Sequence, residues 1–201
     1  MRALSAEPVL SDYRARRGVV RAARSMSALR FVTGTTGNVS IRVSDGILIT
    51  PTRTPYETLR PRSLVHLTLA GERTGRGEPS IEWPIHAAIY RVRPDAVAIV
   101  HTHSPWATAR GFQPDSLEVR TEERSYYGLE SVPVVPAHAS GSAELAEAVA
   151  QAAGSSELLL LAHHGVIAAG SSPQEALERC ALAEHLCQVD LLLREAAVGH
   201  C

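Results

Sequence analysis

Apolar residues recur at helical spacing in several stretches of the chain. In residues 9–30 they alternate with arginines, so that one face is apolar and the other charged, which predicts an amphipathic helix. The same spacing predicts helices over residues 82–93, 142–153 and 172–194, with Ser172 as the N-cap of the last one. A further helix is expected to start at Ser104 and Pro105, with proline at its first position.

Shorter segments rich in β-branched residues predict strands. Residues 39–42 and 46–50 flank a turn at Ser44 and Asp45, which is the pattern of a β-hairpin. The other predicted strands are residues 64–69, 96–101, 132–135, 158–162 and 166–169. Because hairpin signals are frequent, we expect an α/β fold with a mixed, largely antiparallel central sheet covered by helices, in a single domain over residues 1–201.

The composition indicates which partners to expect. The 201 residues are 45% apolar and carry a formal net charge of −1, which leaves no electrostatic footprint for nucleic acid or an anionic membrane. No run approaches the ~18 apolar residues of a membrane span, and the first eight residues lack a signal core. The three cysteines form no CxxC motif. We therefore expect a cytoplasmic protein with no nucleic-acid and no membrane partner.

All 20 basic residues are arginine, and this absence of lysine limits the possible chemistry. The chain cannot form a lysine Schiff base with a carbonyl substrate or with pyridoxal phosphate, and it has no P-loop lysine. Any carbanion chemistry therefore needs another electron sink, for which a metal ion is the obvious choice.

His101 and His103 form the first candidate motif, at the end of an apolar strand. Because residues i and i+2 of a strand face the same side, the two imidazoles are expected to lie side by side. Neutral imidazole is a good ligand for zinc and other late divalent metals. The alternative is two partly exposed histidines with no ligand role, and this motif alone does not decide between the two interpretations.

His163 and His164 end another apolar strand. A third imidazole from this turn would complete a three-histidine site with an open position for substrate, which is typical of a catalytic metal. One of the pair is expected to be a ligand while the other faces away. For His163 alone, a hydrogen-bonded structural role is the better interpretation.

Glu82 stands beside Trp83 at the start of a predicted helix. In a partly apolar cleft its pKa would rise, and it could act as a general acid or base. The alternative is a capping box, in which the carboxylate only stabilises the helix N-terminus. His86 lies four residues on and is either functional or simply buried and hydrogen-bonded.

The segment Gly34-Thr35-Thr36-Gly37-Asn38-Val39-Ser40 is rich in glycine and hydroxyl residues, and Thr50-Pro51-Thr52 follows it. Such a loop exposes backbone N–H groups that can bind an anion such as phosphate. It matches neither the dinucleotide fingerprint nor a P-loop, so a plain tight turn is the alternative.

Taken together and in this order, these motifs resemble the class II aldolase/adducin family over about residues 12–193. The segments that carry the resemblance are residues 36–40, 49–52, 55–56, 79–83, 93–95, 101–103 and 159–165. The resemblance implies a central sheet with helices on both faces. It also implies a homotetramer with active sites between neighbouring subunits.

The resemblance implies roles for individual residues. The metal ligands fall on His101, His103 and His164, and the catalytic acid/base falls on Glu82. The family's epimerases usually have aspartate at the position of Glu82, so a glutamate there favours an aldolase. The substrate- and phosphate-binding positions fall on Gly37, Asn38, Thr52 and Ser80.

Two positions depart from the pattern, and one segment is not aligned with the family. Arg53 replaces a glycine of the fuculose-type aldolases and could bind a phosphate or a carboxylate. Ile81 replaces a serine and removes a hydroxyl from the phosphate pocket. A family tyrosine belongs to a middle segment near Tyr126 and Tyr127.

The implied function is that of a zinc-dependent aldolase, with Mn²⁺ or Co²⁺ as alternative metals. It would cleave or form the C3–C4 bond of a ketose 1-phosphate of the fuculose- or ribulose-phosphate type. The reaction passes through a metal-stabilised enediolate and gives dihydroxyacetone phosphate and a small aldehyde. The alternatives on the same scaffold are a sugar-phosphate 4-epimerase, a methylthioribulose-phosphate dehydratase and a keto-acid sugar-phosphate decarboxylase. A non-catalytic adducin-like scaffold is the least favoured, because its histidines would be expected to be lost.

Overall fold

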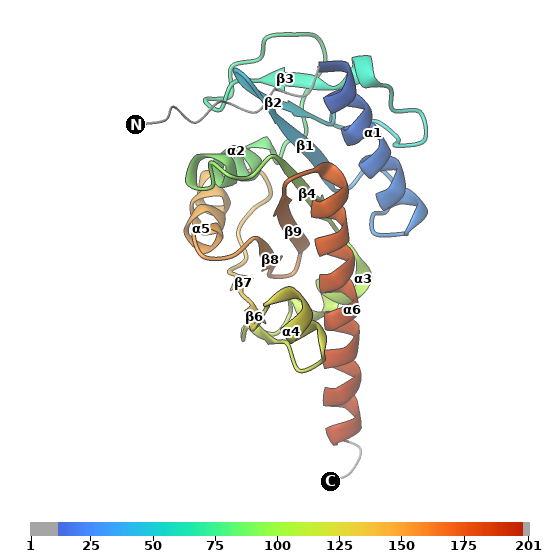
Figure 1. Cartoon of the computed structure of the whole chain (residues 1–201), viewed down its shortest axis with the longest axis vertical. Helices are drawn as coiled ribbons and strands as arrows, with labels where there is room; N and C mark the ends of the chain where they lie inside the picture. Colours follow the sequence, from blue (N-terminus) through green and yellow to red (C-terminus); the bar gives the residue numbers. More distant parts are fainter. Residues whose placement is uncertain (1–11, 199–201) are drawn as a thin grey trace.

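The computed structural model describes residues 12–198, and it has a central sheet between layers of helices (Figure 1). The seven strands of the sheet are, in spatial order, β3 (Val65–Leu67), β2 (Gly46–Ile49), β1 (Asn38–Val43), β4 (Ala98–Thr102), β9 (Gly165–Gly170), β8 (Leu158–Leu161) and β7 (Val134–Val135). Neighbouring strands pair antiparallel except for β7 and β8, which are parallel. The mixed, largely antiparallel sheet expected from the sequence is therefore confirmed.

Helices cover both faces of this sheet, as Figure 1 shows. One face carries α1 (Asp12–Ala28), α3 (Pro105–Arg110) and α6 (Pro173–Val198), and the other carries α2 (Trp83–Val92) and α5 (Ala143–Ala153). The connecting segments contain η1 (Pro61–Ser63), α4 (Glu123–Tyr127) and a separate two-stranded ribbon of β5 (Leu117–Glu118) and β6 (Ser131–Val132). None of the helices in residues 12–198 is long and apolar enough to cross a membrane.

The alternation of side chains along each strand divides the interior into two cores. In β4, Ala98 and Val100 pack toward α1 and α6, whereas Ile99 packs toward α2 and α5. On the α6 side the first core includes the fully buried Cys180 and Cys187. Burial raises the pKa of both thiols, that of Cys187 to about 12.

The predicted hairpin is confirmed, because Val43 pairs with Gly46 across Ser44 and Asp45. The helix expected over residues 9–30 is α1, although residues 9–11 lie outside the described part of the chain. The strand expected at the N-terminal side of His101 is β4, which extends to Thr102.

The single strand predicted over residues 132–135 is wrong. Pro133 divides it into β6, which pairs with β5, and β7, which pairs with β8 in the main sheet. Proline has no N–H to donate to a ladder, whereas its carbonyl remains free to accept a hydrogen bond from Leu160 N at 3.0 Å. The chain therefore changes sheets at this residue.

Candidate metal centre

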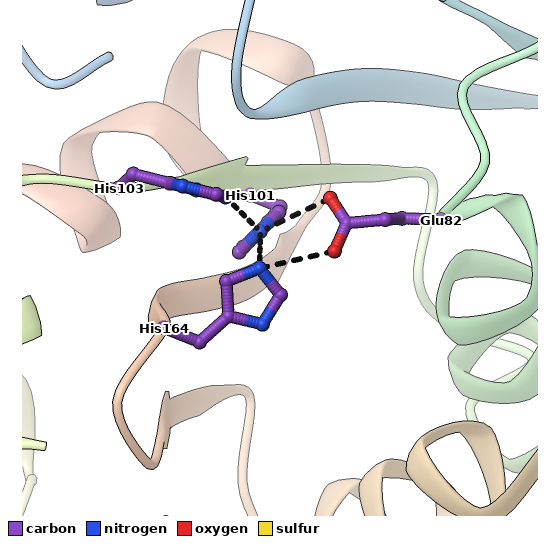
Figure 2. Close-up of side chains that lie close together, drawn as sticks. All are labelled: Glu82, His101, His103 and His164. Atoms are coloured by element: carbon purple, nitrogen blue, oxygen red, sulfur yellow. Dashed lines mark hydrogen bonds and ion pairs between the residues drawn. The ribbon is translucent and has the colours of Figure 1, made fainter. Parts of the chain in front are cut away.

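Three imidazoles converge at one end of the central sheet (Figure 2). His101 lies in β4, His103 follows that strand, and His164 lies in the turn between β8 and β9. His101 Nε2 is 3.0 Å from His103 Nε2 and 3.3 Å from His164 Nε2. Because β4 pairs with β9, the fold brings together side chains that are 63 positions apart in the sequence.

Glu82 faces these imidazoles from the start of α2. Its Oε1 lies 3.0 Å from His164 Nε2 and its Oε2 lies 3.3 Å from His101 Nε2. Each of the four residues offers one ligand atom, and these four atoms all lie within 4.8 Å of one another. Glu82 occupies the N-cap position but makes no side-chain capping hydrogen bond, so the capping-box interpretation does not apply.

The geometry of the cluster fits a divalent cation. Nitrogen ligands at zinc distances of 2.0–2.1 Å are separated by about 3.3 Å along the edge of a tetrahedron, close to the separations among these Nε2 atoms. Glu82 Oε1 is buried and makes no hydrogen bond, although His164 Nε2 lies 3.0 Å away. A buried carboxylate oxygen of this kind is costly unless a positive charge balances it. Three imidazole nitrogens and one carboxylate are a donor set that suits zinc.

A hydrogen bond behind the imidazole of His101 directs its lone pair into the cluster, and a second bond fixes the backbone of His164. His101 Nδ1 donates to the carbonyl of Val166 at 2.9 Å, which leaves Nε2 as the atom with a free lone pair. Thr108 Oγ1 donates to the carbonyl of His164 at 3.3 Å and ties α3 to the turn that holds this residue.

His103 is held through the start of α3. Its backbone N–H donates to Phe31 O at 2.9 Å. The carboxylate of Glu184 on α6 accepts hydrogen bonds from Trp106 N at 3.0 Å and Ala107 N at 2.8 Å, which satisfies two free amides at the start of this short helix. Sequence reasoning missed Glu184, although an acidic residue on the same helical face as two buried cysteines was a signal.

The charged states in the cluster depend on one another. Burial alone would raise the pKa of Glu82, but its interactions with His101 and His164 outweigh burial and hold that pKa below its ordinary value. Burial acts to lower the pKa of His101, and the charge of Glu82 reverses this and raises it. Burial, with the neighbouring His101 and His164, lowers the pKa of His103 to about 3.

Asn38 and Ser80, two of the predicted substrate positions, lie against Glu82. Asn38 Nδ2 donates to Glu82 Oε2 at 2.9 Å and to Ser80 Oγ at 3.0 Å. Gly37 precedes Asn38 with φ +71°, and a Cβ there would lie 2.7 Å from the carbonyl oxygen of His101. The glycine is needed for this close approach of two backbones beside the histidines.

Thr52 and Arg53 lie on the loop next to Ser80. Ser80 N donates to Thr50 O and Thr52 N donates to Glu78 O, both at 3.0 Å, so the two segments run side by side. Arg53 is exposed and has φ +52°, in the left-handed region. The structure thus places the segment of both residues beside Ser80, a predicted substrate position, and does not bring them into the four-residue cluster.

His163 and the two tyrosines lie outside the cluster. His163 turns away from His164 with φ +60°, and its ring stacks on Phe112 with 4.4 Å between ring centroids. Tyr126 and Tyr127 contact each other and line a groove against α6. They are therefore not placed beside the histidines of their own chain.

The sequence and the fold both have known relatives. Residues 17–191 match the model of the Class II Aldolase and Adducin N-terminal domain. An L-fuculose phosphate aldolase from Escherichia coli is 38% identical over 161 residues, which cover 80% of this chain and 75% of that protein. A 3-oxo-tetronate 4-phosphate decarboxylase from Escherichia coli is 32% identical over 190 residues, which cover 92% and 90%. The crystal structure of an L-fuculose-1-phosphate aldolase from Thermus thermophilus matches with a TM-score of 0.82 and 30% identity, over 92% of this chain and 97% of that one.

Proposed function

The chain belongs to the class II aldolase and adducin family, and on that basis we propose that it is a metal-dependent aldolase acting on a ketose 1-phosphate. The reaction separates C3 from C4 and yields dihydroxyacetone phosphate and a small aldehyde. One observation carries the proposal: the buried carboxylate of Glu82 converges with three imidazole Nε2 atoms, all within 4.8 Å of one another.

Zinc is the cation proposed for this site, held by His101, His103 and His164, with Glu82 as a fourth ligand in the absence of substrate. When bound, the cation supplies Lewis-acid stabilisation of the negative charge that develops on the carbonyl and hydroxyl oxygens of the substrate. Because the chain contains no lysine, a Schiff base cannot provide this stabilisation instead.

Glu82 is the proposed proton carrier. In cleavage, the C4 hydroxyl passes its proton to the ionised carboxylate of Glu82, and C4 becomes the carbonyl carbon of the aldehyde. The electron pair of the C3–C4 bond passes to the ketose half as an enediolate, and the Glu82 carboxyl group then delivers the same proton to C3. In condensation, Glu82 removes that proton from dihydroxyacetone phosphate. The lowered pKa of Glu82 keeps it ionised, and this is the form that accepts the first proton in either direction.

The phosphate is proposed to lie against the loop that contains Gly37, between the segments of Thr52 and Ser80. Gly37 has a positive φ, and backbone N–H groups beside such a residue can together bind an anion. Arg53 adds a guanidinium on the adjoining loop, which can pair with two oxygens of a phosphate at once. Asn38 contributes by holding Ser80 and Glu82 together.

Decarboxylation of a keto-acid sugar phosphate is the second candidate, and Arg53 favours it. A guanidinium at this position is equally suited to a carboxylate. The similarity to the 3-oxo-tetronate 4-phosphate decarboxylase, which extends over 90% of that protein, also supports decarboxylation as a candidate reaction. Loss of carbon dioxide from a 3-oxo acid leaves an enolate, so the same Lewis-acid and proton-carrier roles apply.

A homotetramer with active sites between subunits is part of the proposal. Ile81, next to Glu82, is 63% exposed, and Phe112, stacked on His163, is 62% exposed. A neighbouring subunit would cover these two apolar side chains beside the cluster. Size-exclusion chromatography with light scattering should give four times the 21.6 kDa mass of the chain, and a monomer that turns over at the full rate would contradict this assembly.

Proton exchange tests the proposed chemistry directly. The zinc-loaded protein should exchange a C3 hydrogen of dihydroxyacetone phosphate for deuterium in D₂O, as followed by NMR, and chelation should abolish the exchange. Glu82→Gln should retain zinc and slow the exchange by about 10²–10⁴-fold. Glu78→Gln is the matched control, because Glu78 is exposed and paired with Arg73. Absence of zinc binding in the parent protein would overturn the proposal.

A substrate panel separates the two candidate reactions. The aldolase proposal expects release of dihydroxyacetone phosphate from one or more ketose 1-phosphates. The decarboxylase candidate expects release of carbon dioxide from a 3-oxo sugar-acid phosphate, and Arg53→Gln should weaken that reaction through KM. Zinc binding with carbon dioxide release and no C–C cleavage would replace the first candidate by the second.

A further inference from the structure

A chain of buried side-chain hydrogen bonds leads from Glu82 away from the histidines of the cluster. Asn38 Nδ2 donates to Glu82 Oε2, and Asn38 Oδ1 contacts His86 Nε2 at 2.5 Å. His86 Nδ1 lies 2.7 Å from Ser40 Oγ, and that oxygen lies 2.9 Å from the hydroxyl of Tyr90. The four residues beyond Glu82 are each no more than 1% exposed.

The carboxylate at one end determines the direction of every hydrogen bond in this chain. An ionised carboxylate only accepts, so the Asn38 amide must present Nδ2 to Glu82 and turn Oδ1 toward His86. His86 Nε2 must then carry the hydrogen, which leaves Nδ1 to accept from Ser40 Oγ. Ser40 Oγ is consequently the acceptor for the Tyr90 hydroxyl.

The neutral form of His86 is the one that this arrangement requires. Burial is the main cause that lowers the pKa of His86 to about 3, and His101 contributes in the same direction. A protonated ring would carry a hydrogen on Nδ1 and oppose the Ser40 hydroxyl hydrogen. The fold therefore keeps one tautomer of a neutral imidazole behind Asn38.

We propose that His86 is a positioning residue: it locks the Asn38 amide in the orientation that directs Nδ2 to Glu82 and Ser80, and so fixes the carboxylate at the reacting carbon. Without a donor at His86, the amide can rotate and place Oδ1 against the carboxylate, where two acceptors repel each other. The inference rests on the proposed role of Glu82 as proton carrier. It assigns to His86 no contact with the substrate or the metal.

The tautomer of His86 can be tested without metal or substrate. Nitrogen-15 NMR of the full-length, metal-free protein should show His86 with its hydrogen on Nε2 and a bare Nδ1. The opposite tautomer would overturn the proposal, because Nε2 could then not donate to Asn38.

Variants of the zinc-loaded protein test the consequence for catalysis. His86→Leu removes the donor and should lower the rate of proton exchange at C3 by about 10–100-fold, with zinc content and KM unchanged. His86→Gln restores an N–H donor and should recover most of that rate. Tyr90→Phe is the matched control, because it removes a buried hydrogen bond at the far end of the chain and should lower stability without lowering the exchange rate.

Two further results complete the test. Ser40→Ala, a smaller change that removes the donor to His86 Nδ1, should slow exchange in the same direction, and it serves if His86→Leu does not fold. If His86→Leu and Ser40→Ala exchange as fast as Tyr90→Phe, His86 is only structural and the inference is wrong. If the parent protein binds zinc but exchanges no proton, the role of Glu82 fails, and this inference fails with it.

Discussion

Asn38 and His101 stand directly opposite each other in the antiparallel ladder of β1 and β4. Residues paired in this way project from the same face of a sheet. The register of the two strands therefore determines that Asn38, which contacts Glu82, and His101, a proposed metal ligand, lie on the same face. A slip of one residue would turn one of them to the other face.

Removal of any one histidine of the cluster should abolish tight metal binding. His101→Ala, His103→Ala or His164→Ala each takes away one of three nitrogen ligands, and affinity should fall on the order of 100-fold or more. Zinc content after dialysis against a weak chelator measures this. His163→Ala is the control, since that ring stacks on Phe112, and loss of zinc there would contradict the ligand assignment.

Gly37→Ala should destabilise the protein more than Gly34→Ala does. Both glycines are in the left-handed region, at φ +71° and +62°. Alanine at Gly37 would also meet the His101 carbonyl at 2.7 Å, whereas a Cβ at Gly34 has nothing within 4 Å. The backbone cost common to both is about 1 kcal/mol. Urea unfolding of the metal-free proteins gives the difference, and equal losses would show that the two backbones separate easily.

Acid should destabilise the metal-free protein through His86. Its folded pKa of about 3 is below the unfolded value, so its contribution to stability is complete above about pH 6.5 and is lost as the pH falls toward 3. Between pH 7.5 and 5 this amounts to about 2 kcal/mol. His86→Gln lacks this titration, so the parent protein should lose that much more stability over the interval in urea unfolding. Parallel losses in the two proteins would show that the buried ring titrates normally.

Arg110 should matter more to stability than Arg194, although both pair with Asp190. Arg110 is fully buried between α3 and α6 and contacts Asp190 Oδ2 at 2.7 Å, whereas the side chain of Arg194 is 41% exposed. Arg110→Ala should cost about 3–5 kcal/mol because it leaves a buried carboxylate poorly paired. Arg194→Ala should cost about 1 kcal/mol or less. Thermal unfolding at pH 7 distinguishes them, and similar losses would mean that Arg194 can replace its neighbour.

The parts of the site that follow from local periodicity could be predicted from the sequence. Strand alternation puts His101 and His103 on one face, and the end of an apolar strand locates His164. The contact of Asn38 with Glu82 spans 44 positions, and that of Glu184 with Ala107 spans 77. The periodicity of a single helix or strand cannot predict such contacts, because they depend on how separate elements pack.

Two local features also escaped the sequence patterns, for different reasons. The helix Glu123–Tyr127 is only five residues long, too short to show a helical period. The segment around Pro133 reads as a single apolar strand, because the residues on both sides are β-branched. Pro133 has no N–H to donate, and this divides the segment into two strands although its neighbours favour one continuous strand.

Cys180 and Cys187 lie on the buried face of α6, so their chemical labelling reports when this helix separates from the rest of the protein. A thiol reacts with an alkylating reagent as the thiolate, and burial both excludes the reagent and raises the pKa of these two groups. Their labelling must therefore wait until α6 separates from the sheet. Because α6 also carries Glu184, which holds the start of α3 beside His103, the labelling rate should report the opening events that also loosen this proposed metal ligand.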